Sequence, residues 1–311
     1  MAVTGNEVQV KRISRARTFH LSGRKTMAYL MVLPALLIIL GVVFYPIADA
    51  FWLSLHDIDL RYPQQGEPFI GLKNYTDAFA DPDLWDAFRF TSLFAVISVS
   101  LELVFGMGVA LLLHRKFAGR GLVQALVLIP WSLTTVIVAR MWNLIYNSEY
   151  GILNALLKGV GLIQENKLWT ADKDLTFWAV VIADVWKATP FMALILLAGL
   201  QVIPDDLYEA AKMDGATGWQ AFWHITLPSL RATMVVALIF RTIDATRVFD
   251  MVFVLTNGNY GTSSLNLFTY NRLFKELNFG SGSALAIITF VYIALIAMLY
   301  LYVGRQRDKR A

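Results

Sequence analysis

The chain has 311 residues, of which 57% are hydrophobic and 16% charged, and its formal net charge is +4. Soluble domains are roughly 45–50% apolar and about 25% charged, so this composition excludes an ordinary water-soluble globule. The sequence contains no cysteine, which excludes disulfides, zinc–thiolate sites and iron–sulfur clusters.

Long apolar stretches recur along the whole chain, and a helix of about 20 such residues crosses the hydrocarbon of a bilayer. We therefore predict an all-α membrane protein with six transmembrane helices over residues 27–304, between basic tails at 1–26 and 305–311. The fifth span is the least regular, because four charged residues interrupt it. The predicted spans are Ala28 to Leu55, Phe88 to Leu113, Leu122 to Ile145, Leu175 to Leu200, Thr233 to Leu255 and Ser283 to Val303.

The charges that flank the spans predict the orientation, because Lys and Arg concentrate on the cytoplasmic side. Six basic residues precede the first span against one acid, whereas seven acids and two basic residues lie between the first two spans. This places both termini in the cytoplasm of a multi-pass protein of the cell (plasma or inner) membrane. The basic N-terminal tail is explained by the lipid surface, so no nucleic-acid partner is expected.

The loop at about 201–229, between spans four and five, has a helix signature. Asp205 and Asp206 follow Pro204, and acids in a first turn suit the positive end of the helix dipole. Gly215 follows a short apolar stripe and can end the helix. A short helix parallel to the membrane is expected here. On these residues alone, it either rests on lipid or contacts another protein.

This loop also carries a motif. Glu209-Ala210-Ala211 is separated by three residues from Gly215, which is separated by nine residues from Ile225, and after one more residue Leu227-Pro228 follows. The spacing resembles the EAA loop of permease subunits of binding-protein-dependent ABC importers. Further stretches look like carbohydrate-uptake permeases, closest to those of actinobacterial trehalose and maltose importers. They are Phe69-Ile70-Gly71-Leu72 with Asn74-Tyr75, Trp186-Lys187 before Pro190-Phe191, and Phe240-Arg241-Thr242 through Phe249-Asp250 with Leu255-Thr256-Asn257-Gly258.

The resemblance implies a set of partners. The EAA segment would be a cytoplasmic coupling helix that contacts an ATPase subunit. The complex would hold a second permease, as a heterodimer, two ATPase subunits and an extracytoplasmic sugar-binding protein or lipoprotein docked near Phe69 to Phe79 and Gly258 to Phe279. The implied coupling residues are Glu209, Ala210, Ala211, Asp214 and Gly215.

The chain has no phosphate-binding loop of its own, since no Gly-x4-Gly-Lys-Ser/Thr string occurs. We therefore expect it to bind no cofactor and not to be an enzyme, with ATP and Mg on the separate ATPase subunits. The four histidines show no metal-ligand spacing, so no metal site is expected either.

Charged residues inside the spans are costly, at least about 2.5–3.5 kcal/mol each, and normally face a cavity or one another. Asp184 and Lys187 lie three apart in span four, with Phe191 a further turn along, while charges of alternating sign follow at spacing three in span five. Structural pairing, through ion pairs within the helix or contacts that fasten it to its neighbours, is one interpretation, and it is favoured for Arg247 and Asp250. Glu102, alone in span two, is expected to bond a neighbouring helix.

A sugar site is the other interpretation, because sugars are bound by carboxylates and Arg beside an aromatic ring. It is favoured for Asp184, Lys187, Phe191, Arg241 and Asp244. In maltose-type permeases the sugar contacts fall in these two spans. Counted from the EAA motif, they land on Asp184, Lys187, Ala188, Phe191, Arg241, Asp244, Ala245 and Val248. Several side chains there differ from the maltose pattern, so the place is implied but its detailed chemistry is not.

The expected function is therefore translocation of a sugar, a disaccharide such as trehalose or maltose, into the cytoplasm by ATP-driven alternating access. A gradient-driven secondary transporter is the alternative, because Asp184 and Asp244 are the kind of intramembrane carboxylates it would use. Such a transporter would show inverted repeats of matched spans, and none is detected. Trp131, Trp142 and Tyr146 are assigned to packing or to the membrane interface.

Overall fold

The computed structural model describes the backbone of residues 21–308 and the side chains of residues 27–302. Most of the two basic tails lies outside these ranges. The chain forms two units, divided after Asp49. The first contains α1 (Leu21–Ile39) and the π-helical turn η1 (Leu40–Phe44), and α2 (Tyr45–Ser54) runs across the boundary. Apolar side chains stay exposed along this helix, as expected for a span that faces lipid.

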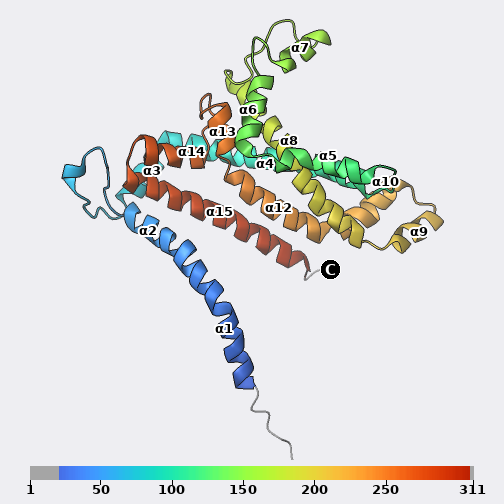
Figure 1. The fold of residues 1–311 in the computed structure, drawn as a ribbon, viewed down its shortest axis with the longest axis horizontal. Helices are drawn as coiled ribbons and strands as arrows, with labels where there is room; N and C mark the ends of the chain where they lie inside the picture. Colours follow the sequence, from blue (N-terminus) through green and yellow to red (C-terminus); the bar gives the residue numbers. More distant parts are fainter. Residues whose placement is uncertain (1–20, 309–311) are drawn as a thin grey trace, which may run out of the picture. The chain divides into compact units, whose positions relative to one another are not determined.

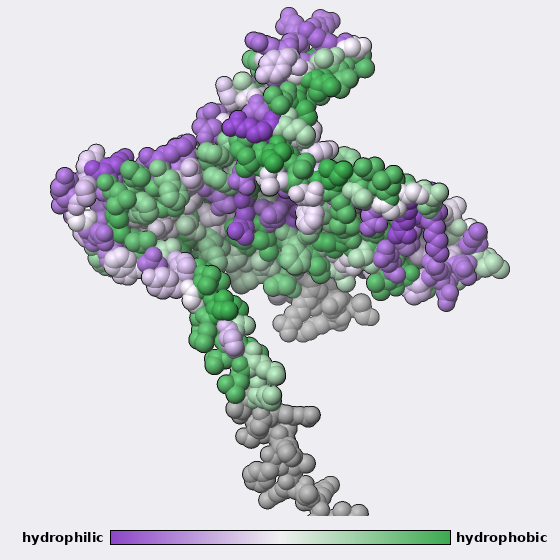
Figure 2. Space-filling model, in the orientation of Figure 1, coloured by the Kyte–Doolittle hydropathy of each residue, from purple (hydrophilic) through white to green (hydrophobic). Residues whose placement is uncertain are grey.

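The second unit is built on two long helices, α4 (Pro82–His114) and α8 (Lys173–Val202), which pack along each other. Against this pair lie α5 (Arg120–Ser132) and α12 (Arg231–Thr246), and α15 (Phe279–Asp308) packs along α12, as Figure 1 shows. Their facing sides bury an apolar core that includes Phe94, Leu113, Met192 and Leu196. Apolar side chains also cover much of the outer surface of these helices (Figure 2), which is where lipid would contact them.

Within the described residues, four uninterrupted helices are long and apolar enough to cross a membrane, and counting each of two bent helix pairs as one span gives up to six. The predicted all-helical membrane fold is confirmed. Short elements connect the long ones. They are η2 (Pro63–Gln65), α3 (Lys73–Ala80), α6 (Thr135–Ile145), α7 (Ile152–Gly159), α9 (Asp205–Met213), α10 (Gly218–Ala221), η3 (Phe222–Thr226), α11 (Leu227–Ser229), α13 (Asp250–Leu255), α14 (Leu265–Tyr270) and η4 (Asn271–Lys275).

The third span is not the continuous helix that was expected from Leu122 to Ile145. It consists of α5 and α6, which meet at 93°. Leu133 and Thr134 are extended between them, and Pro130, just before the break, has no N–H to donate to the helix. The bend lies between Trp131, near the end of α5, and Thr135, the first residue of α6.

The fifth span also differs from the prediction of one helix from Thr233 to Leu255. The bend of 66° lies before this range, between the segment Gly218–Ser229 and α12, and within the range α12 already ends at Thr246. Phe249, with φ of −136° and ψ of −66°, lies outside the helical region before α13 begins at Asp250. The backbone carbonyls freed by the break are bonded elsewhere, since Ser264 Oγ donates to Val248 O at 2.7 Å and Asn266 Nδ2 to Arg247 O at 2.8 Å. Broken helices at membrane depth need such replacement partners.

The loop between α2 and α3 is held by hydrogen bonds at its base. Asn74 Nδ2 donates to the carbonyls of Ser54 and His56, both at 2.9 Å, and the hydroxyls of Ser54 and Tyr75 lie 2.6 Å apart. Phe69, by contrast, is exposed. The loop between α2 and α3 therefore combines a fixed base with an exposed rim.

The packing of α4 on α8 predicts a stability difference between two glycines of the same helix. A Cβ at Gly106 would lie 2.8 Å from Met192 Cγ and 3.2 Å from Ala193 N, whereas a Cβ at Gly108 would meet nothing within 4 Å. We expect Gly106→Val to lower the melting temperature of the purified protein, because overpacking costs about 1–3 kcal/mol. Gly108→Val carries the same change in helix propensity and serves as the control. Equal melting temperatures for the two variants would contradict the close approach of these helices.

Candidate functional site

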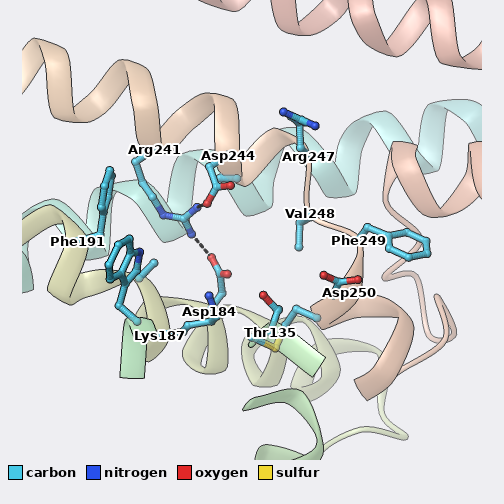
Figure 3. A pocket seen from close by; sticks show the side chains of 14 residues that line it. Thr135, Asp184, Lys187, Phe191, Arg241, Asp244, Arg247, Val248, Phe249 and Asp250 are labelled. Carbon is cyan, nitrogen blue, oxygen red and sulfur yellow. Dashed lines mark hydrogen bonds and ion pairs between the residues drawn. The ribbon is translucent and has the colours of Figure 1, made fainter. Parts of the chain in front are cut away.

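A polar cavity lies beside the break in the fifth span (Figure 3). Its walls come from both helices of the bent third span, from α8, from α12 and from the segment that leads into α13. All eight positions that the EAA-based count selects line it, and the remaining lining residues are Trp131, Thr135, Arg247, Phe249, Asp250 and Met251. The cavity is open and holds about 160 Å³. That is less than the ~300–1,000 Å³ of complete ligand pockets.

Arg241 is the centre of the charged groups in this cavity. Its Nη1 donates to Asp244 Oδ2 at 2.7 Å, and its Nη2 donates to Asp184, as the dashed lines in Figure 3 mark. The Arg241 side chain is 3% exposed, while that of Asp244 is 79% exposed. Arg241 therefore forms the floor, and the carboxylates that it holds face the cavity.

Glu102 of α4, which does not line the cavity, also bonds Arg241. Its two carboxylate oxygens accept from Arg241 Nε at 2.5 Å and from Nη2 at 2.8 Å. The expectation that this carboxylate bonds a neighbouring helix is confirmed. A buried charge without a partner would cost several kcal/mol, and this pair satisfies both groups.

Among the described residues, Arg247 and Asp250 do not form the ion pair within the helix that was one of the two structural roles favoured for them. Within the part of the chain that the structure describes, neither takes part in a salt bridge, and their side chains point in different directions in Figure 3. The reason is the break in the helix, because the spacing of three brings side chains together only where the helix continues. Both residues line the cavity instead.

Two aromatic rings form one wall of the cavity. Trp131 and Phe191 stack with centroids 5.7 Å apart and planes inclined by 19°. The sequence assigned Trp131 to packing or the membrane interface, and only the bend between α5 and α6 reveals that it lines the cavity. Trp142 and Tyr146 do pack, against Trp186 and Trp169, and Tyr146 donates to Ala179 O at 3.0 Å.

The EAA segment lies at the end of the unit where α9 and α10 meet (Figure 1). Asp205 and Asp206 occupy the first turn of α9, and Gly215 has a φ of +79°, so the predicted helix and its glycine terminator are both present. Tyr208 faces inward, with its hydroxyl 3.0 Å from that of Thr226. Glu209, Ala210 and Met213 are exposed. The predicted coupling residues thus include a face of α9 that no other described part of the chain covers.

Comparison with known proteins identifies the family. Residues 102–309 match the model of the inner membrane component of binding-protein-dependent transport systems. The chain belongs to this family. The permease is 46% identical over 283 residues to the trehalose/maltose transport system permease protein MalF of Thermococcus litoralis, covering 90% of this chain and 94% of the relative. It is 38% identical over 286 residues to the trehalose transport system permease protein SugA of Mycobacterium tuberculosis. This match covers 92% of this chain and 91% of the relative.

The fold is shared with solved structures as well. A bacterial ABC transporter involved in the import of the acidic polysaccharide alginate has a chain that superimposes on the permease with a TM-score of 0.78 at 23% identity, covering 91% of the permease and 96% of that chain. The overall fold of the permease is therefore one that a chain of this ABC transporter also adopts.

Proposed function

We propose that the permease translocates a neutral disaccharide, trehalose or maltose, into the cytoplasm as one subunit of an ATP-driven importer. The observation that carries this proposal is the cavity at the helix break, where fixed carboxylates stand beside stacked Trp131 and Phe191 rings. Sugars present hydroxyl donors and apolar ring faces, which these two kinds of group complement. Asp184, Lys187, Phe191 and Asp244 are the proposed contacts, and Arg241 holds the two carboxylates.

The charge of the cavity supports a neutral substrate. Three acids line it, Asp184, Asp244 and Asp250, and three bases, Lys187, Arg241 and Arg247. The lining therefore has no excess of positive charge that would attract an anionic sugar. The relatives named for trehalose and maltose transport agree with this choice of substrate.

The volume of the cavity supports the presence of a second permease. An open space of about 160 Å³ is a partial pocket, so another subunit would supply the facing wall, in a heterodimer whose two halves enclose the sugar. An extracytoplasmic binding protein would dock on the outer loops, at 69–79 and 258–279. Both termini and the EAA loop would then face the cytoplasm.

Coupling to ATP would proceed through α9. In this proposal Glu209, Ala210, Ala211, Asp214 and Gly215 contact an ATPase subunit, which binds ATP and Mg, while the permease itself has no catalytic role. Closure of the two ATPase subunits opens the cavity outward, and hydrolysis returns it to the cytoplasmic side. The affinity for sugar must differ between these states, because equal affinity would move no substrate.

Reconstitution tests the proposal. The test uses proteoliposomes that contain the permease, its partner permease and the ATPase, together with the binding protein. They are expected to accumulate labelled trehalose or maltose only when ATP is inside the vesicles and the binding protein is on the outside. Liposomes without the ATPase should show no uptake, with or without an imposed proton or sodium gradient. Gradient-driven uptake by the permease alone would refute the proposal and establish the secondary-transporter alternative.

A further inference from the structure

Glu102 does not line the cavity, yet it is bonded to the residue at its centre. It lies in the middle of α4 with 0% of its surface exposed, and both of its oxygens accept from the same edge of the Arg241 guanidinium. This two-point contact fixes the plane of the guanidinium as well as its position. Any change at Glu102 therefore reaches the cavity through Arg241.

The contacts of Arg241 leave it little capacity to bind a further anion. A guanidinium has five N–H donors. Four hydrogen bonds are formed, two to Glu102 and one each to Asp184 and Asp244. An anionic group that approaches Arg241 therefore meets a cluster of three carboxylates around one guanidinium. The negative charge of this cluster exceeds its positive charge.

The formal charges in and behind the cavity also disfavour an anionic ligand. The three acids and three bases that line the cavity cancel, and Glu102 behind them adds one negative charge. In a partly buried site a single uncompensated charge changes the affinity for an ionic ligand much more than it changes that for a neutral one.

We propose that Glu102 sets the preference of the cavity for neutral over acidic sugars by neutralising Arg241 from behind. It is a positioning and specificity-determining residue that touches no substrate itself. This inference rests on the proposed function, because it assumes that the cavity binds sugar.

Binding measurements on the importer complex in nanodiscs, without the binding protein, test this role. The probes are trehalose and the trehalose uronic acid in which one primary alcohol is oxidised to a carboxylate, so that shape is nearly constant and charge is not. The wild type is expected to bind trehalose more tightly than the acid. In Glu102→Gln the ratio of the two dissociation constants should shift toward the acid by about tenfold, the order expected when one of the three carboxylates around a buried cation loses its charge.

Two further variants separate charge from shape. Glu102→Asp keeps the charge and should keep the wild-type ratio, and Glu149→Gln makes the same chemical change on the outer surface and should leave both dissociation constants unchanged. If Glu102→Gln weakens both sugars equally, the residue only supports the fold and the inference is wrong. If that variant does not assemble, Glu102→Gln combined with Arg241→Gln removes both charges, and a shift toward the acid in this double variant contradicts the inference. A wild type that binds neither sugar would instead overturn the proposed function.

Discussion

Replacing Asp244 with alanine is expected to raise the KM for sugar uptake by roughly ten- to a hundredfold. Its carboxylate is fixed by Arg241 Nη1 at 2.7 Å and is 79% exposed to the cavity, so it is positioned to accept sugar hydroxyls. A hydrogen bond to a charged group contributes about 1.5–3 kcal/mol, and about 1.4 kcal/mol corresponds to a factor of ten. Because the side chain is exposed, its removal should leave folding and assembly with the ATPase largely intact.

The measurement is the concentration dependence of labelled-sugar uptake by the reconstituted importer, with co-purification of the ATPase as the check on assembly. Asp174→Ala is the matched control, since this carboxylate is also exposed but lies in the first turn of α8, outside the cavity. It should leave the KM unchanged. An unaltered KM in Asp244→Ala would remove this residue from the sugar site.

Replacing Gly215 with valine is expected to reduce transport at least about tenfold while ATPase activity persists. The φ of +79° at Gly215 costs a residue with a Cβ about 1–2 kcal/mol, and a β-branched side chain fits there worst. No atom of the described chain lies within 4 Å of the added Cβ, so the variant keeps its internal packing. The substitution therefore changes the backbone and the surface at the end of α9, where the ATPase is proposed to dock.

A second substitution separates backbone strain from blocked docking. Asparagine adopts positive φ more readily than valine, so Gly215→Asn relieves the strain but retains a side chain on the exposed surface. Transport and ATP hydrolysis are measured in the same proteoliposomes. Loss of coupling in both variants indicates a contact with the ATPase, whereas loss only in Gly215→Val indicates backbone strain. Normal uptake by Gly215→Val would refute the coupling role of this segment.

The sequence located the candidate site well because a motif acted as a fixed reference. The EAA spacing lies between α8 and α12, so counting along two helices from it reaches residues on both sides of the cavity. The membrane-spanning character of the fold was predictable for another reason, because apolar runs of sufficient length indicate membrane crossing directly. The ion pair between Arg241 and Asp244 is one that their helical spacing of three made possible.

The breaks in the spans could not be obtained in this way. The length of an apolar run does not reveal a 93° bend within it, so the third span was predicted as one continuous helix. Trp131 was for the same reason not placed at the cavity. The end of α12 depends on Ser264 and Asn266, which bond the freed carbonyls from positions 16 and 19 residues further along the chain. The partner of Glu102 lies 139 residues away. Interactions over such separations leave no periodic signal in the sequence.

The most direct test of the whole account is an electron cryo-microscopy map of the assembled importer with trehalose trapped during transport. We expect sugar density between the two permeases, within hydrogen-bond distance of Asp184 and Asp244 and against the Trp131–Phe191 stack. Sugar density bound elsewhere in the permease pair, with this cavity filled only by water, would contradict it.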